Sequence, residues 1–145
     1  MKKLLSIFVM TLVVVQYAVA GDVITQDPNQ LPPAARSFLA KYFNQVEISH
    51  IKIESDLLRG KTYDVLLIDR TELEFDSKGN WTEIDCQRKA VPEDLIPVRV
   101  KQYVQVNFPR ETITKIERRA GIEVELTSDF SLKFNKRGKF ISADE

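Results

Sequence analysis

The chain has 145 residues, with 21 Lys and Arg, 21 Asp and Glu, one histidine and one cysteine. Its balanced charge argues against a nucleic-acid-binding protein, because such proteins concentrate basic residues to displace counterions from phosphates. The single cysteine, Cys86, excludes an intrachain disulfide. We expect a semi-buried thiol at the end of a strand; an interchain bridge is the alternative, since exported proteins meet oxidising surroundings.

Residues 1–20 have the pattern of a signal peptide. Met1-Lys2-Lys3 gives a positive start, an apolar run follows, and Ala18-Val19-Ala20 is a small-x-small cleavage site. The apolar run is shorter than the roughly 20 residues that a spanning helix needs. We therefore expect a periplasmic or secreted chain with no transmembrane segment after signal removal. Removal leaves 145 − 20 = 125 residues, with 21 − 2 = 19 basic and 21 acidic side chains.

Two later segments predict amphipathic helices. Apolar residues recur at helical spacing from Leu31 to Phe43, and again from Ile96 to Phe108. Pro32 and Pro97 suit the first turn of a helix, where a missing N–H costs nothing. A short lead-in, residues 21–30, precedes the first helix.

After each helix the apolar period changes from 3.6 residues to 2, which is typical of strands with one buried face. Four antiparallel strands are expected after each helix. The eight expected strands are Ile48–Glu54, Tyr63–Ile68, Leu73–Phe75, Asn80–Asp85, Ile113–Arg118, Ile122–Leu126, Phe130–Phe134 and Lys139–Ala143.

One hairpin pattern occurs twice, in residues 73–81 and, 59 positions later, in residues 132–140. Asp76 or Asn135 opens the turn, and Gly79 or Gly138 closes it. An Asp or Asn at the first position can hydrogen-bond the backbone of the turn, and glycine accepts the positive φ that such a turn requires. These four residues are structural turn positions, and the spacing indicates internal duplication.

The sequence therefore predicts an α+β fold of two tandem repeats, each one helix followed by a four-stranded antiparallel sheet. The first repeat is residues 31–87 and the second is residues 88–145. A unit of this size is marginal alone, so we expect the two to pack as one structural unit. One helix covers only one face of a sheet, which leaves the other face available to a partner.

The order of these motifs, found twice, resembles the PepSY-like family of exported bacterial proteins, also described as beta-lactamase-inhibitor-like. The likeness is carried by Leu31-Pro32, Phe38-Leu39, Phe43, Ile48, Ile51, Tyr63, Val65, Phe75-Asp76, Gly79 and Trp81, and by Ile96-Pro97, Tyr103-Val104, Phe108-Pro109, Ile113, Ile116, Val124, Phe134-Asn135, Gly138 and Phe140. It implies a tandem fold similar to beta-lactamase inhibitor protein and a non-catalytic role. It does not imply inhibition of a beta-lactamase, because fold and function separate freely.

Catalytic equipment is sparse in the sequence. His50 is the single histidine and no nucleophile motif accompanies it, so most Ser/His/Asp and Cys/His schemes are excluded. Asp76, Lys78 and Asn80 lack the twelve-residue spacing and terminal Glu of a calcium loop, and zinc would need several Cys and His ligands. We expect no catalytic residue, no metal site and no cofactor.

The candidate partner-binding residues lie on the side expected to face away from the helices. Leu66, Ile68 and Ile84 are apolar there, and they either form an exposed patch that marks an interface or are buried between the two units. Glu72 and Glu74 share that face. Cross-strand pairs with lysines such as Lys115 and Lys133 account for the outward Glu123 and Glu125 without any chemistry.

Leu57 and Leu58, in the loop of the first repeat, complete the candidate set. The sequence predicts a non-catalytic module that binds an unidentified periplasmic or secreted protein or peptide through its uncovered sheet faces and loops. The alternative is a protein that binds a small ligand or envelope component in a cleft between the repeats.

Overall fold

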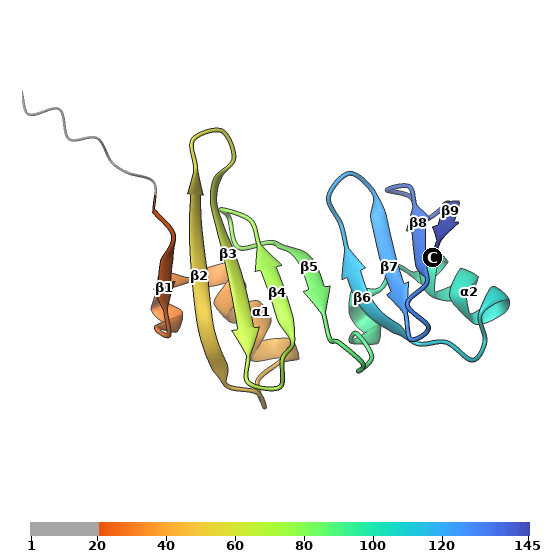
Figure 1. Ribbon diagram of the computed structural model, residues 1–145, viewed down its shortest axis with the longest axis horizontal. Coiled ribbons are helices and arrows are strands. Elements are labelled where there is room, and N and C mark those ends of the chain that lie inside the picture. The colour runs from red at the N-terminus through yellow and green to blue at the C-terminus, as the bar shows by residue number, and fades with distance from the viewer. Residues whose placement is uncertain (1–20) are drawn as a thin grey trace, which may run out of the picture.

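The computed structural model describes residues 21–145, and the predicted signal peptide lies outside the described residues (Figure 1). Nine strands form one sheet in chain order, and every neighbouring pair is antiparallel. The strands are β1 (Val23–Thr25), β2 (Ile48–Asp56), β3 (Gly60–Leu67), β4 (Glu72–Phe75), β5 (Trp81–Asp85), β6 (Ile113–Glu117), β7 (Ile122–Leu126), β8 (Ser131–Phe134) and β9 (Phe140–Asp144). The α-helices are α1 (Pro33–Tyr42) and α2 (Val98–Asn107), with 3-10 turns η1 (Pro28–Gln30) and η2 (Glu93–Leu95).

The prediction of an α+β fold with two repeats, each holding its own four-stranded sheet, is wrong. β5 pairs with β6, with Ile84 opposite Ile116, so the strands continue as one mostly β structure. Alternation identifies the buried face of a strand but not its neighbour, and an unpaired edge strand offers free N–H and C=O groups to another strand. The lead-in also adds β1, which pairs with β2.

Both helices pack on the same face of the sheet. α1 lies behind β2, β3 and β4 in Figure 1, where the ring of Phe38 meets Phe75 edge-on at 5.7 Å. On α2, the ring of Tyr103 stacks on Phe140 at 4.5 Å and meets Phe134 edge-on at 5.4 Å. The inward side chains of the strands belong to one hydrophobic cluster that runs from β2 to β8. The opposite face carries no helix in residues 21–145.

The two expected turns connect β4 to β5 and β8 to β9. Asp76 Oδ1 accepts hydrogen bonds from the N–H groups of Lys78 and Asn80, both at 2.9 Å, and Asn135 makes the corresponding pair in the second turn. Gly79 has φ +84° and Gly138 has φ +77°. The turn at Gly79 also lies against the start of α1, so it fixes where that helix meets the sheet.

Cys86 follows β5 directly and is 5% exposed. Burial raises the pKa of its thiol to about 11, so the thiolate is scarce at neutral pH. A buried thiol at the end of a strand fits this environment better than an interchain bridge. Within residues 21–145, no helix has the length and apolar character needed to cross a membrane.

A carboxylate row on the uncovered sheet face as candidate functional site

The uncovered face of the sheet carries a line of acidic side chains that crosses the strands. From β3 to β7, the register places one carboxylate of each strand directly opposite the next: Asp64, Glu74, Glu83, Glu117 and Glu123. We call these five residues the carboxylate row. Neighbouring strands are about 4.8 Å apart, so the row extends roughly 19 Å across the sheet.

Arg119 is the cation that contacts all three middle residues of the row. Its Nη2 is 2.6 Å from Glu74 Oε2 and 3.2 Å from Glu83 Oε2, and its Nε is 3.4 Å from Glu117 Oε1. Lys115 adds a second contact to Glu83, at 2.8 Å. These two cations offset part of the repulsion that like charges directly opposite each other produce in a sheet.

The lysines at the two ends of the row pair mainly outside it. Lys52, opposite Asp64, forms ion pairs with Asp22 and Glu54. Lys133, opposite Glu123, forms an ion pair with Asp144 at 2.6 Å. Within residues 21–145, neither Asp64 nor Glu123 has an ion-pair partner.

Burial, and then the neighbouring charges, raise the pKa of Asp64. Partial burial raises the pKa of Asp64 to about 6, and the negative charges of Glu74 and Glu54 add to the rise, while Lys52 opposes it. The Asp64 carboxylate therefore ionises at a cost in the folded protein. A positive charge brought close to it from outside would lower that cost.

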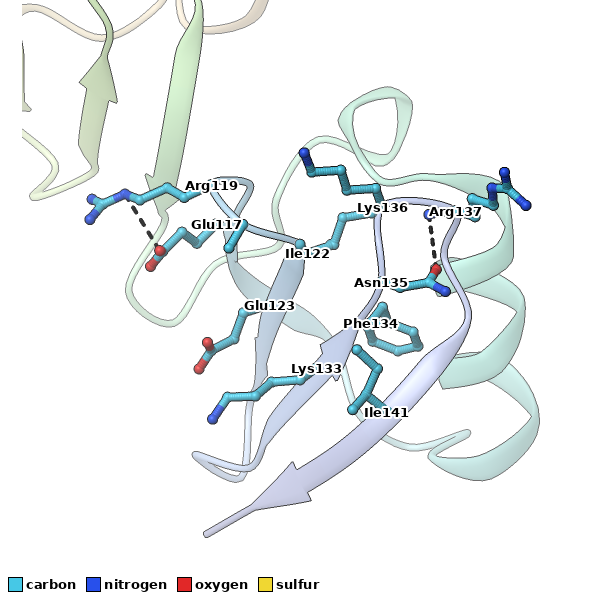
Figure 2. A pocket seen from close by; sticks show the side chains of 12 residues that line it. Glu117, Arg119, Ile122, Glu123, Lys133, Phe134, Asn135, Lys136, Arg137 and Ile141 are labelled. Carbon is cyan, nitrogen blue, oxygen red and sulfur yellow. Dashed lines mark hydrogen bonds and ion pairs between the residues drawn. The ribbon is translucent and has the colours of Figure 1, made fainter. Parts of the chain in front are cut away.

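Two hollows open on this face at either side of Glu83 and Glu117. One, of about 350 Å³, is lined by side chains that include His50, Asp64 and Leu66. The other, of about 650 Å³, is lined by residues of β6 to β9 and their turns. Figure 2 shows Glu123 and Lys133 extending in the same direction from neighbouring strands, while Arg137 extends the opposite way.

The structure separates the three apolar candidates. Leu66 is half-buried on the uncovered face and lines the smaller hollow together with Glu72 and Glu74. Ile68 lies beyond the end of β3 and is 61% exposed. Ile84 is fully buried at 0% exposure and lies opposite Ile116 of β6, so of the two alternatives the exposed patch does not apply to it, although alternation had placed it away from the helices.

A bulge explains the error at Ile84. The pairing of β4 with β5 shifts register between Glu74 and Phe75, which inserts one extra residue into the alternation of β5. Trp81 and Ile84 therefore both face the helices, although they are three residues apart. Sequence alternation alone cannot place such a bulge.

Leu57 and Leu58 are at the tip of the β2–β3 hairpin, 99% and 96% exposed. Asp56 Oδ1 holds this tip by accepting hydrogen bonds from the N–H groups of Leu58 at 2.7 Å and Arg59 at 3.0 Å. The two leucines are not part of the carboxylate row. They form a separate exposed apolar contact at the tip of the hairpin.

Sequence reasoning identified Glu74 but not the row to which it belongs. Asp64 and Glu117 gave a detectable signal, since each takes an outward position in a strand with alternating pattern, whereas the bulge in β5 hid the outward position of Glu83. What brings them together is the pairing of β5 with β6. That pairing was not predicted, so the alignment of charges was missed.

His50, the single histidine of the chain, lines the smaller hollow beside the row. The Nδ1 atom of His50 is 3.5 Å from Ser49 Oγ, on the uncovered side of β2. In residues 21–145, no group of three or more His, Cys, Asp or Glu side chains is placed to hold a metal ion. The carboxylate row is thus an acidic surface that a cationic group can contact.

Comparison with protein families finds one match. A family described as "Putative beta-lactamase-inhibitor-like, PepSY-like" matches residues 61–142. No curated protein matches the chain.

Several solved structures are similar over nearly their whole length. A "putative periplasmic protein of unknown function" from Bacteroides vulgatus is 43% identical, with TM-score 0.83, covering 86% of this chain and 100% of that one. A second putative periplasmic protein from the same organism is 35% identical, with TM-score 0.81 and coverage of 88% and 99%. A "putative calcium-regulated periplasmic protein" from Bacteroides thetaiotaomicron is 35% identical, with TM-score 0.80 and coverage of 86% and 97%. The predicted compartment agrees with these descriptions.

Proposed function

The chain belongs to the PepSY-like family, and from its uncovered sheet face we propose that it is a non-catalytic periplasmic module that binds a basic segment of a partner protein. The observation that carries this proposal is the carboxylate row. Five carboxylates in register are costly to the fold, and a cationic ligand offsets that cost. Complementary charge also guides partners into register and accelerates their encounter.

The free acidic positions favour an external cation. Arg119 and Lys115 contact the middle of the row, whereas Asp64 and Glu123 at its ends have no ion-pair partner in residues 21–145. A basic segment lying across the strands can therefore place its cations near both ends of the row. The distance of roughly 19 Å suits an extended segment of about six residues.

An apolar contact supports the same proposal. Leu66 lines the smaller hollow next to Asp64 and Glu72, so an aliphatic side chain of the partner can insert there. Interfaces commonly combine such an anchor with a charged rim. Leu57 and Leu58 supply a second apolar contact where the partner extends past the hairpin tip.

The small-ligand alternative took its cleft to lie between two repeats with separate sheets. Because β5 pairs with β6 in one continuous sheet, no gap between two separate sheets supports that alternative. The family is described as inhibitor-like, which supports a binding role. A protein ligand on the open face is therefore the better proposal.

A peptide titration tests this function. The probe is a ten-residue peptide of alternating Lys and Ala, titrated calorimetrically into residues 21–145 at low and at physiological salt. We expect saturable binding that weakens with salt, because the contacts are ionic. The double variant Asp64→Asn/Glu123→Gln should weaken binding about tenfold.

The matched control is Glu93→Gln/Asp94→Asn. It removes the same formal charge from η2, which precedes α2 on the other face of the sheet. Equal loss of affinity in both double variants would show that net charge alone attracts the peptide. That result would overturn the assignment of the site to the carboxylate row.

A further inference from the structure

A second site lies beside Trp81, among residues of the helix-covered side. A pocket of about 340 Å³ opens between Trp81 at the start of β5, Leu95 of η2 and Ile122 at the start of β7. Its remaining lining includes three basic side chains, Arg118, Arg119 and Lys136, and no carboxylate. Pockets of this size hold small ligands.

Arg118 is fixed in place at the rim of the pocket. Its guanidinium carbon lies 3.6 Å from the centroid of the Trp81 ring, and its Nε donates a hydrogen bond to the backbone oxygen of Trp81 at 2.8 Å. Within residues 21–145, its two terminal nitrogens have no hydrogen-bond or ion-pair partner. The Trp81 ring thus fixes the position of the Arg118 guanidinium, and the terminal N–H groups of Arg118 remain available to a ligand.

Burial also affects the charge of Arg118. Partial burial lowers the pKa of Arg118, which means that the protein environment disfavours its positive charge. Arg119 is drawn toward Glu74 and Glu83 and is partly neutralised there. Lys136, in the β8–β9 turn, has no ion-pair partner among the described residues. Of the three cations that line the pocket, Arg118 and Lys136 are therefore the two that no carboxylate neutralises.

We propose that this pocket binds a small apolar carboxylate. The apolar part lies against Trp81, Leu95 and Ile122, and the carboxylate accepts hydrogen bonds from Arg118 and Lys136. An arginine fork matches the two oxygens of a carboxylate, and a charged hydrogen bond is strongest where water is partly excluded. The absence of acidic groups from the lining disfavours cations. This site contains no residue of the carboxylate row, although Arg119 borders both, and it does not depend on the proposed function.

The chain provides its own reporter, because Trp81 is its single tryptophan. The probe is 3-phenylpropionate, which does not absorb at the wavelengths that excite tryptophan selectively. Its neutral isostere, 3-phenylpropionamide, has the same apolar group without the charge. We expect 3-phenylpropionate to change Trp81 emission saturably, with the amide at least tenfold weaker.

Two variants in one turn provide a matched pair. Lys136→Gln should weaken 3-phenylpropionate binding about fivefold, whereas Arg137→Gln should leave it unchanged, because Arg137 is not part of the lining. In Figure 2, the side chains of Lys136 and Arg137 extend from the turn in opposite directions. Both residues are exposed, so neither substitution should disturb folding, which circular dichroism checks.

Three results would overturn the proposal. Equal affinity for the acid and the amide would indicate an apolar pocket with no anion recognition. Equal loss in the two variants would indicate general attraction of anions. No saturable change in Trp81 emission, and none in the amide NMR signals of Gly121 and Ile122, would show that the pocket is not a site for this ligand class.

Discussion

Arg119 donates from Nη2 to Glu74 Oε2 over 2.6 Å and so joins two residues that are 45 positions apart in the sequence. The contact crosses β5, because Glu74 lies on β4 and Arg119 follows β6. The same side chain also reaches Glu83 and Glu117. Arg119 thus connects strands on both sides of the pairing between β5 and β6.

Replacing Arg119 should expose the repulsion within the carboxylate row. Because the side chain is about half exposed, we expect Arg119→Gln to lower the free energy of unfolding by only about 1 kcal/mol at pH 7. Urea unfolding at low and at high salt measures the effect. The deficit should shrink at high salt, because salt screens the charges of exposed ion pairs, and Arg137→Gln should show none; a deficit independent of salt would indicate lost packing instead.

Removing the charge of Asp64 should stabilise the protein. Its pKa is about 6 in the folded chain against 3.8 for an unperturbed aspartate, so the folded state binds the proton more tightly and ionisation costs stability. We expect Asp64→Asn to raise the free energy of unfolding by about 1 kcal/mol at pH 7, after allowance for solvent screening.

The gain from Asp64→Asn should shrink as pH falls through about 6 and vanish below about 4, where Asp64 is protonated in both states. Thermal unfolding across that range measures it. Asp94→Asn, at an exposed position of η2, is the control. A gain independent of pH would contradict the assignment of the strain to the Asp64 charge.

Two glycines separate backbone strain from steric contact. Gly79 has φ +84°, and an added Cβ would lie 2.8 Å from the backbone nitrogen of Ala35 and 2.9 Å from the Cβ of Pro32. Gly60 has a similar φ of +78°, but its nearest contact would be at 3.6 Å. We expect Gly60→Ala to cost about 1 kcal/mol and Gly79→Ala about 3 kcal/mol in unfolding free energy. Equal costs would show that the turn is not wedged against α1.

Ile84 and Ile68, two of the candidate partner-binding residues, test whether Ile84 is buried in the core. Ile84 is 0% exposed and packs in the core, whereas Ile68 is 61% exposed. We expect Ile84→Ala to cost about 3 kcal/mol of stability and Ile68→Ala less than about 0.5 kcal/mol. Chemical denaturation of the two variants measures the difference, and similar values would contradict the bulge that turns Ile84 inward.

Much of the local structure could be predicted from the sequence. The apolar stripes located both α-helices within two residues at each end, and alternation located eight of the strands. The turns at Asp76 and Asn135 follow from residue chemistry alone, because Asx hydrogen bonds and glycine φ are local properties. Local signals therefore sufficed wherever the determining contacts were close in sequence.

The predictions that failed depended on contacts distant in sequence. Three features were not predicted: the pairing of β5 with β6, the register shift that buries Ile84, and the addition of β1 to β2. They are decided by side-chain packing and by the unpaired N–H and C=O groups at strand edges. None leaves a pattern within one strand. The carboxylate row depends on that same pairing of β5 with β6 and, at Glu83, on that same register shift, so its residues could not be placed in one line from the sequence.

The most direct test of the central proposal is an amide NMR titration of residues 21–145 with the alternating Lys-Ala peptide. Binding on the uncovered face predicts that the largest shifts occur at Asp64, Glu74, Glu83, Glu117 and Glu123 and in their strand neighbours, and that they diminish as salt is added. Shifts concentrated on α1 and α2, or spread evenly over the acidic residues of the whole surface, would contradict it.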